Sequence, residues 1–488
     1  MTGVQTCALP IFSAAPSIAH NKPPAILSLI GDTPLVQVTQ FDTGPCQLFL
    51  KLENQNPGGS IKDRIALSMI EAAEAEGHLQ PGGTVVEATA GNTGLGLALV
   101  AGAKGYSVLL VIPDKMSQEK ISHVKALGAE VRITRSDVTR GHPEYYQDVA
   151  ARLAQEIPGA FYVNQFGNPA NPLAHERTTG PEIWEQMRHD VDAIVVGVGS
   201  GGTLTGLGRF FNRVKPRRGI EMVLADPTGS ILYEYVKTGK LVESGNWAVE
   251  GIGEDFVPEI ADMSLVTDAF EIDDEESFAT ARELLRKEGI FGGSSTGTLV
   301  AGALRYCRQQ TKAKRVVSLV PDTGNKYLSK MYSDFWMAEQ GFIHRPPHGD
   351  LSDLISHRYE AGEVITVGLD DSLLTAFKRM RGSDVSQLPV VDQSGRAVGI
   401  IDESDLLVKV HRDPSHFNDP VKKAMTDRLE TLPPNTTIKD LLGVFDRGRV
   451  AIVMEDDRFL GLVTRTDLLS YLRLHMPKST TPPEREFV

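Results

Sequence analysis

Short apolar runs alternate with amphipathic stretches over residues 25–340 of this 488-residue chain. Because the short runs are nearly all apolar, we expect parallel strands that are buried on both faces of their sheets. Alternation of strands with helical patterns predicts open, doubly wound α/β sheets, which bind ligands at the carboxyl ends of their strands. The six strands predicted in this way cover residues 84–88, 107–112, 130–133, 193–198, 220–225 and 315–320.

A glycine turn with the sequence PGGSIKDR (57–64) lies between a predicted strand at 46–53 and a predicted helix at 61–75. This arrangement places Lys62 in the first helical turn. The positive end of the helix dipole favours loss of the lysine's own charge, and a neutral amine can form an imine with a carbonyl compound. An isolated lysine in this position is more often a surface residue, so the interpretation depends on what the other loops provide.

The loop GVGSGG (197–202) follows a predicted strand and opens a helix. It satisfies the dinucleotide pattern G-x-G-x-x-G, and Asp226 ends the next strand, so a dinucleotide-dependent oxidoreductase is an alternative. Consecutive backbone N–H groups at a helix N-terminus suit a single phosphate equally well. We assign a cofactor phosphate to this loop, with donors from Gly199, Ser200, Gly201, Gly202 and Thr203.

Two further loops complete the predicted site. TAGNTG (89–94) ends a strand and starts a helix, and its N–H groups and hydroxyls suit the α-carboxylate of an amino acid, although an ordinary N-cap would look the same. The residues assigned to the carboxylate are Thr89, Ala90, Gly91 and Thr93. Asn92 would donate its amide to a phenolic oxygen. In FGGSSTG (291–297), Ser294 would place a neutral hydroxyl against a pyridine nitrogen.

An imine-forming lysine, a phosphate loop, a carboxylate loop and a ring partner together indicate pyridoxal phosphate, held by Lys62 as a Schiff base. A hydroxyl partner leaves the pyridine ring uncharged, which favours β-elimination and β-replacement over transamination.

The formal net charge of −13 argues against nucleic acid or an anionic membrane as the main partner. The three cysteines, Cys7, Cys46 and Cys307, show no metal-ligand spacing and fit a reducing, cytoplasmic location. No apolar run approaches the roughly 20 residues of a membrane helix. The first dozen residues, MTGVQTCALPIF, resemble translated sequencing-adaptor sequence, and we interpret them as non-native.

The C-terminal third contains an internal repeat. LPVV (388–391) followed by GIIDESDL (399–406) recurs as VAIV (450–453) followed by GLVTRTDL (461–468). Each unit has a helical stretch, two strands and a closing helix. The predicted organisation is an N-terminal tail (1–24), a catalytic domain (25–340), a linker (341–357), a tandem repeat module (358–474) and a flexible tail (475–488).

The four loops resemble those of the fold-type II pyridoxal-phosphate enzymes, in particular the β-replacement branch, which contains cysteine synthases and cystathionine β-synthases. The segment QFGNPANP (165–172) is similar to the same branch, and the resemblance implies that Gln165 lies at the substrate. It also implies an α/β core of doubly wound sheets in two subdomains.

Two features distinguish the subgroups. VEGIGEDFVP (249–258) resembles the mobile loop of cystathionine β-synthases, which implies that Gly251 and Glu254 contact substrate, although animal relatives carry tyrosine at the position of Glu254. The repeat resembles a tandem α+β CBS-domain (Bateman) module, which binds adenosyl compounds in many proteins. Thr464 and Asp467 fit its ribose-contacting pattern, whereas Asp402 replaces the hydroxyl residue in the first repeat.

The resemblance therefore implies a bacterial, haem-free cystathionine β-synthase. Such an enzyme condenses L-serine with L-homocysteine to cystathionine, with Lys62 moving the α-proton, and forms a homodimer or homotetramer. Haem and other metals are not expected: Cys7 and His20 are suggestively spaced, but Cys7 lies in the non-native leader. Ala90 stands where many relatives have serine, and Phe166 where animal relatives have tyrosine.

Two other functions stay open. A cysteine synthase would use O-acetylserine and sulfide on the same residues, although ordinary cysteine synthases lack the tandem module. A non-catalytic adenosyl sensor would bind its ligand at the tandem module and retain the catalytic domain only in an inactive form.

Overall fold

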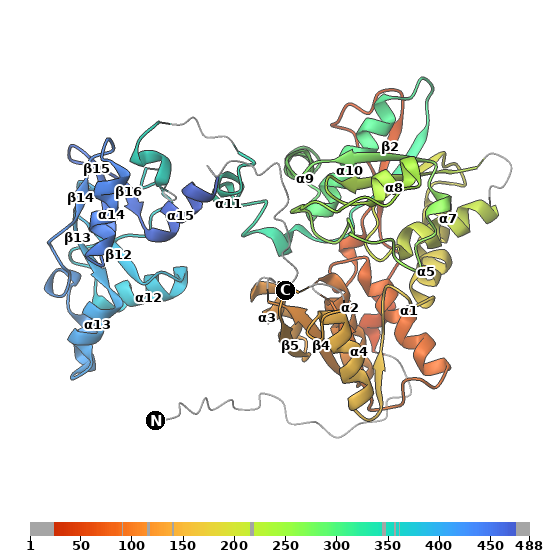
Figure 1. The fold of residues 1–488 in the computed structure, drawn as a ribbon, viewed down its shortest axis with the longest axis horizontal. Coiled ribbons are helices and arrows are strands. Elements are labelled where there is room, and N and C mark those ends of the chain that lie inside the picture. Colours follow the sequence, from red (N-terminus) through yellow and green to blue (C-terminus); the bar gives the residue numbers. More distant parts are fainter. Residues whose placement is uncertain are drawn as a thin grey trace, which may run out of the picture. The chain divides into compact units, whose positions relative to one another are not determined.

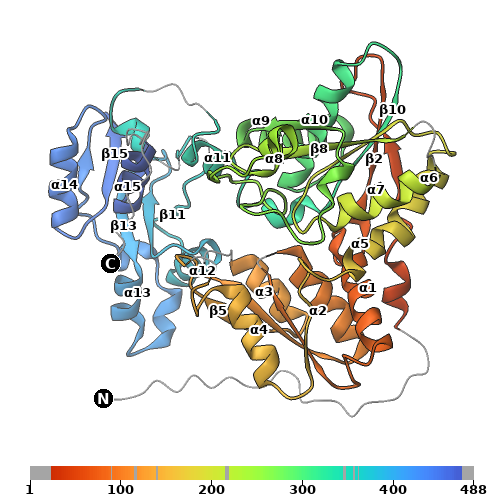
Figure 2. The same cartoon turned by 45° about the vertical axis from the view of Figure 1, so that its right-hand side comes forward.

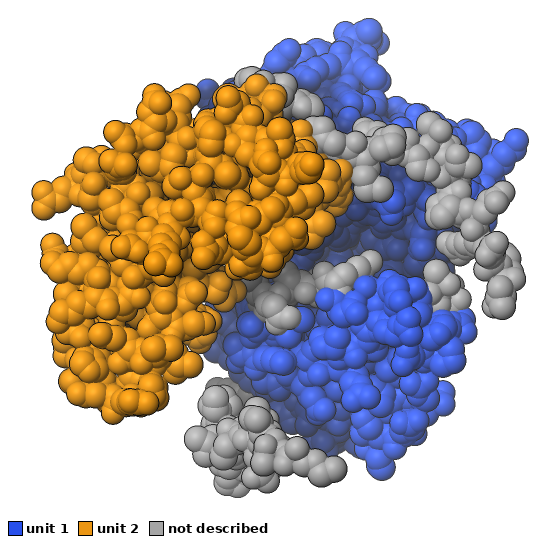
Figure 3. Space-filling view, turned by 60° about the vertical axis from the view of Figure 1, so that its left-hand side comes forward, with its two compact units in different colours: residues 1–332 blue, residues 333–488 orange. Residues whose placement is uncertain are grey.

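A computed structural model describes residues 24–89, 91–114, 118–138, 141–214, 219–343, 348–355, 358–360 and 362–474. Ala90, Cys7 and His20 lie outside these residues. The chain divides into two compact units, residues 1–332 and 333–488, coloured separately in Figure 3. The predicted boundaries at 340 and 357 stay predictions.

The first unit contains a small sheet of four parallel strands in the order β5-β4-β3-β6. Its strands are β3 (Thr84–Ala88), β4 (Ser107–Pro113), β5 (Glu130–Thr134) and β6 (Ala160–Tyr162). Helices α1 (Lys62–Ala75) and α2 (Asn92–Lys104) share a buried core with one face of this sheet. Helix α4 (Tyr146–Glu156) packs on the other face, and α3 (Gln118–Ala126) lies beside β5 (Figure 2).

The same unit contains a large sheet of six strands in the order β1-β2-β10-β7-β8-β9. Its strands are β1 (Leu35–Gln37), β2 (Gln47–Lys51), β7 (Ala193–Val196), β8 (Glu221–Pro227), β9 (Asp268–Ile272) and β10 (Arg315–Leu319). All pairs are parallel except β1 with β2. The remaining helices are α5 (Ala170–Ala174), α6 (Gly180–Gln186), α7 (Gly202–Val214), α8 (Leu232–Thr238), α9 (Asp274–Glu288) and α10 (Ser294–Arg308). Figure 1 labels strand β2 of this sheet, which lies near helices α8, α9 and α10.

These two sheets confirm the predicted α/β core and all six predicted strands. One expectation is wrong. We expected every strand to be buried on both faces, but β5 is the edge of the small sheet and has only exposed or half-buried residues, with Ile133 46% exposed. A single partner strand and little helical cover leave this edge in contact with solvent.

The glycine turn before α1 lies against the end of β10. Ile61 N donates to Pro321 O (2.8 Å), Thr323 N donates to Gly59 O (3.1 Å), and Ser60 forms an isolated bridge with Asp322. Gly59 has a positive φ of 73°, a conformation that favours glycine. The turn and the carboxyl end of β10 therefore meet where α1 begins.

The second unit begins with α11 (Asp334–Glu339) and contains two similar three-stranded sheets. The first combines β11 (Val367–Gly368), β12 (Gln387–Val391) and β13 (Ala397–Asp402) with α12 (Leu373–Ser383) and α13 (Glu403–Val410). The second combines β14 (Thr431–Leu432), β15 (Ala451–Glu455) and β16 (Arg458–Val463) with α14 (Ile438–Asp446) and α15 (Arg465–Leu474). In both sheets a parallel pair precedes an antiparallel pair that carries a bulge, which confirms the repeat.

Candidate active site

Lys62 is the first residue of α1, directly after the glycine turn. Burial lowers the pKa of its amine, while the carboxylates of Asp322 and Glu254 act in the opposite direction. A Cβ added at Gly96 of α2 would lie 2.9 Å from Lys62 O, so α2 packs directly on the backbone of this turn. The lysine is therefore held between two helices in surroundings that favour a neutral amine.

Asp322 follows β10 and is buried beside Asn92. Its Oδ2 accepts hydrogen bonds from Asn92 Nδ2 (2.8 Å) and the Tyr327 hydroxyl (2.8 Å). Lys326 Nζ donates to Asn92 Oδ1 (2.6 Å), so both ends of the Asn92 amide have partners. Asp322 was not predicted from the sequence, although an acidic residue shortly after an apolar strand is a recognisable signal for a site in an α/β sheet.

Ser294 begins α10 and is 1% exposed. Its hydroxyl accepts a hydrogen bond from Glu250 N (2.9 Å) and bonds to the hydroxyl of Tyr327, whose pKa is raised by burial and by Asp322. Ser294 thus belongs to the same network as Asp322 and Asn92. The structure brings these predicted cofactor residues together through Tyr327, which sequence analysis also missed.

The glycine-rich loop at 199–203 leads into α7, as predicted. Gly201 has a φ of 86°, and a Cβ there would lie 2.4 Å from Ala261 Cβ. A Cβ at Gly202 would lie 1.9 Å from Asn171 Oδ1, while Asn171 Nδ2 donates to Ser200 Oγ (2.9 Å). Packing thus excludes a side chain at Gly201 and Gly202, and the first backbone N–H groups of the 13-residue helix α7 have no partner within the helix. Such a cradle fits a phosphate group.

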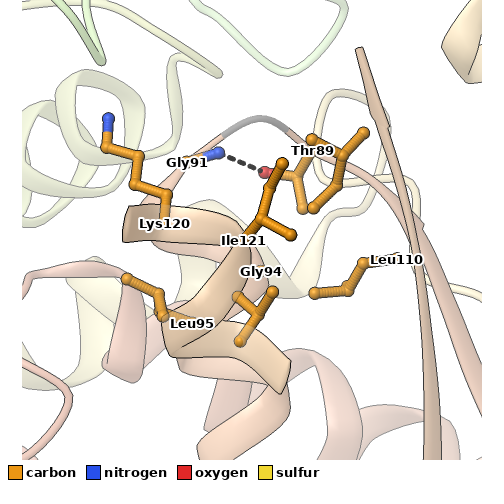
Figure 4. Close-up of a pocket in the computed structure, with 9 residues that line it drawn as sticks. Thr89, Gly91, Gly94, Leu95, Leu110, Lys120 and Ile121 are labelled. Atoms are coloured by element: carbon orange, nitrogen blue, oxygen red, sulfur yellow. Dashed lines mark hydrogen bonds between the residues drawn. The ribbon is translucent and has the colours of Figure 1, made fainter. Parts of the chain in front are cut away.

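The 89–94 loop joins β3 to α2, and Figure 4 shows it over a small pocket that Lys120 of α3 also lines. Gly91 N donates to Thr89 Oγ1 (3.2 Å), and Thr93 Oγ1 donates to Gln165 Oε1 (2.7 Å). Gln165 therefore lies beside the predicted carboxylate loop although the two are distant in sequence.

Residues 248–254 connect both sheets. Gly253 N donates to Val198 O (2.9 Å) at the end of β7. Glu250 forms ion pairs with Lys120 of α3 and with Lys330 (2.7 Å). Glu254 is half-buried. Burial raises the pKa of its carboxyl well above the usual range, Asp255 raises it further, and Lys62 opposes the shift. The electrostatic interaction places Glu254 in the surroundings of Lys62, whereas substrate contacts of Gly251 and Glu254 stay predictions.

Asp226, the candidate ribose acid of the dinucleotide alternative, is fully buried at the end of β8. Its Oδ2 accepts a hydrogen bond from Tyr233 N (2.9 Å) in the first turn of α8. This carboxylate therefore stabilises a helix start and is not presented to a ligand.

Thr464 and Asp467 lie at the start of α15. The Thr464 hydroxyl donates to Asp467 Oδ2 (2.6 Å), and Asp467 N donates to Thr464 Oγ1 (3.3 Å). Asp402 and Asp405 cap α13 in the same way in the first repeat. Helix capping is sufficient to explain both pairs, so the adenosyl contacts stay predictions.

Within the described ranges, no group of three or more His, Cys, Asp or Glu side chains is arranged to hold a metal ion. The described helices also include none that is long and apolar enough to cross a membrane.

Comparisons with known proteins agree with this geometry. Residues 26–322 match the family described as "Pyridoxal-phosphate dependent enzyme", and residues 352–412 and 421–474 each match the CBS domain. The chain is 36% identical to cystathionine beta-synthase of Dictyostelium discoideum over 93% of both proteins. It is 32% identical to the Saccharomyces cerevisiae enzyme of that name, over 93% of this chain and 98% of the yeast protein.

Among solved structures, an O-acetylserine dependent cystathionine beta-synthase from Helicobacter pylori is similar with a TM-score of 0.58 and 34% identity. The similarity covers 62% of this chain and 97% of that protein. A hydrogen sulfide-producing enzyme from Fusobacterium nucleatum is similar with a TM-score of 0.58 and 36% identity, over 62% of this chain and 99% of that one.

Proposed function

Because the chain belongs to the cystathionine β-synthases, a family of pyridoxal-phosphate-dependent β-replacement lyases, we propose that it condenses L-serine with L-homocysteine to give L-cystathionine and water. The observation that carries the proposal is the position of Lys62. It starts a helix beside the buried network of Asn92 and Asp322. A relative named cystathionine beta-synthase that aligns over 93% of this chain, and therefore along most of its tandem module, supports the choice of homocysteine as second substrate.

Three groups of residues would hold the cofactor. Lys62 would bind its carbonyl carbon, and the cradle of Gly199, Ser200, Gly201, Gly202 and Thr203 would bind its phosphate. Asn92 would donate to its phenolic oxygen and Ser294 to its ring nitrogen. The backbone N–H groups at the start of α7, which have no partner within the helix, support the cradle, and the shared network of Asn92 and Ser294 supports the ring contacts.

Bound pyridoxal phosphate supplies an electron sink for negative charge at the substrate α-carbon. Thr89, Gly91 and Thr93 would hold the α-carboxylate at the start of α2, where the helix dipole favours an anion. The amine of Lys62 then removes the α-proton, a role that its lowered pKa supports. Nζ would pass this proton to the serine hydroxyl, which leaves as water. The homocysteine thiol would then lose its proton to Nζ as its sulfur bonds to the β-carbon, and Nζ would deliver that proton to the α-carbon to complete cystathionine.

Substitution of Lys62 tests this proposal. Lys62→Ala should abolish cystathionine formation and the visible absorbance of the lysine-bound cofactor. Asp226→Asn is the matched control, because it keeps an acceptor for Tyr233 N and should retain most of the activity. Cystathionine formation by the Lys62→Ala protein at the unsubstituted rate would contradict the proposal. If the unsubstituted protein shows the absorbance band and Lys62→Ala lacks it, the alternative of a non-catalytic adenosyl sensor is also excluded.

Cysteine synthesis from O-acetylserine and sulfide is the second candidate. The observation that favours it is the similarity to the O-acetylserine dependent enzyme of Helicobacter pylori. Matched assays with serine or O-acetylserine, each with homocysteine or sulfide, separate the two. We expect the highest specificity constant for serine with homocysteine, and a higher value for O-acetylserine with sulfide would reverse the order of the candidates.

The tandem module suggests an adenosyl ligand at Thr464 and Asp467, a type of ligand consistent with the two CBS matches. Titration calorimetry with S-adenosylmethionine and other adenosyl compounds tests this, and absence of binding heat would contradict it.

We also propose a homodimer or homotetramer. Exposed apolar side chains on the module's helices, such as Val408 (75% exposed) and Leu469 (67%), support association. The buried, unpaired Cys46 and Cys307 support a reducing cytoplasm.

A further inference from the structure

His175 lies in a π-helical turn, His175–Thr179, between α5 and α6. Such turns are rare in proteins and often occur at functional sites. The side chain of His175 is completely buried. Helix α7 approaches it closely because residue 206 is glycine, and a Cβ there would lie 2.7 Å from His175 Cβ. The chain thus packs an imidazole directly against the helix whose first turn forms the phosphate cradle.

Both ring nitrogens of His175 face threonine hydroxyls. Nδ1 lies 2.9 Å from Thr179 Oγ1, and Nε2 lies 3.3 Å from Thr203 Oγ1. Thr203 is the second residue of α7 and the hydroxyl-bearing member of the cradle at its helical end. A chain of three polar side chains therefore runs from the π-helical turn to the proposed phosphate position.

The surroundings keep the imidazole neutral. Burial lowers the pKa of His175 well below its ordinary value, and the positive charge of Arg64 lowers it further. Glu182 opposes these effects. A neutral imidazole has one N–H donor and one acceptor nitrogen, so each of the two threonines meets a different partner.

A phosphate group accepts hydrogen bonds, so the Thr203 hydroxyl must use its single O–H group to donate to the phosphate. Thr203 Oγ1 then has only acceptor capacity left for His175, which requires a proton on Nε2. We propose that His175 is a positioning residue, held as the Nε2–H tautomer, that aims the hydroxyl of Thr203 at the cofactor phosphate. Thr179 completes the chain by donating to Nδ1. This inference rests on the proposed phosphate cradle.

A double-mutant cycle on the full chain tests the proposal, with pyridoxal 5′-phosphate titrated into the cofactor-free protein. His175→Leu should weaken cofactor affinity about tenfold, the size expected for one hydrogen bond to a charged group. In the Thr203→Val background the same change should have no further effect, because the hydroxyl that it positions is absent. The ³¹P resonance of the bound phosphate should shift in His175→Leu and in Thr203→Val.

The proposal would be overturned if His175→Leu lowered cofactor affinity equally in the unsubstituted and Thr203→Val proteins. It would also be overturned if His175→Leu left both the cofactor affinity and the ³¹P resonance unchanged. ¹⁵N-histidine spectra of the cofactor-loaded protein give the tautomer directly, even when His175→Leu fails to fold. His175→Gln assigns the resonance, and a proton on Nδ1 would overturn the proposal. His189→Leu is the control, because His189 is exposed and its ion pair is with Glu185 at the surface. Failure of the unsubstituted protein to bind the cofactor would contradict the proposed site itself.

Discussion

Glu87 carries a buried carboxyl beneath the proposed carboxylate loop. Ala88 N and Gln165 N donate to it, yet burial raises its pKa from 4.5 to about 8. The folded chain therefore holds this proton more tightly than the unfolded chain. The resulting contribution to stability is fully present below pH 4.5 and is lost as the pH rises towards about 8.

Glu87→Gln should remove this pH dependence, because the amide does not titrate. Relative to the unsubstituted protein, the variant loses one acceptor, which costs about 1 kcal/mol at low pH. It should then gain in relative stability between pH 4.5 and about 8. Thermal unfolding of both proteins across this pH range measures the difference in stability. If the stabilities of the two proteins changed with pH in the same way, the raised pKa of the Glu87 carboxyl would be contradicted.

Gly293→Ala tests the network around Asp322. A Cβ at this position would lie 2.0 Å from Asp322 Oδ1 and 2.5 Å from Tyr327 Cε2, so both side chains must move. We expect cofactor affinity to fall by roughly 5- to 150-fold, since a strain of roughly 1–3 kcal/mol falls on the residues around the cofactor. Gly382→Ala in α12 is the control, because a Cβ there meets no atom within 4 Å. Equal cofactor affinity in both variants would contradict this network.

At the level of residues, sequence predicts what lies within one loop and misses what the fold brings together. Lys62 and the glycine-rich loops were identified from local patterns. Asp322 was not, because its partner Asn92 lies 230 residues earlier in the chain. The partners of His175 likewise belong to a separate helix.

At the level of elements, the segment 248–254 contacts helix α3, which packs on the small sheet, and helix α9, which belongs to the half of the unit that contains the large sheet. Glu250 joins α3 to Lys330, and Asp274 at the start of α9 accepts from Ala248 N (2.8 Å) and Val249 N (3.0 Å). The ion pairs of Glu250 are partly buried, and burial makes such contacts stronger than those at a surface. This segment therefore depends on a few charged contacts for its position.

Glu250→Gln should loosen the segment without unfolding the chain. Losing the charge-assisted contacts to Lys120 and Lys330 should lower the local opening free energy by about 1–3 kcal/mol. Hydrogen exchange of residues 248–254 should become faster by a corresponding factor. Glu283→Gln is the control, because its pairs with Arg286 and Lys287 are exposed and contribute little. Unchanged exchange would show that the segment is held by its backbone contacts alone.

Hydrophobic patterns predicted the long strands well because a strand between two parallel neighbours is apolar throughout. They missed β1, β6, β9, β11 and β14, most of which are short strands. Strands β1 and β6 have three residues each and lie at sheet edges, and β11 and β14 add a third strand of two residues to each repeat unit, for which two strands were predicted. Exposure of β5 was mispredicted because sequence does not show which strand ends a sheet. Edge position is a property of the sheet and not of the segment.

At the level of the whole molecule, the chain forms two compact units with separate hydrophobic cores. The internal repeat revealed the second unit from sequence because each copy reproduces the same strands and helices. The order of strands within the large sheet was not predictable, since β2 pairs with β10 after the whole small sheet has intervened.

Calorimetry of the full chain should show two unfolding transitions, one for each unit. Pyridoxal phosphate should raise the midpoint of the first unit's transition only, because a ligand stabilises the unit that binds it. The shift should grow with the logarithm of free ligand concentration. A single transition displaced as a whole would show that the units unfold together.

The pairing of β2 with β10 also concerns the growing chain on the ribosome. Lys62 is synthesised early, but Ser294 and Asp322 emerge only after the small sheet is complete. Until then β2 has an open edge, which favours aggregation, and Lys62 lacks the buried surroundings that lower the pKa of its amine. In a nascent chain that ends before residue 322 the amine would therefore stay protonated, and imine formation with the cofactor would follow the folding of the whole first unit.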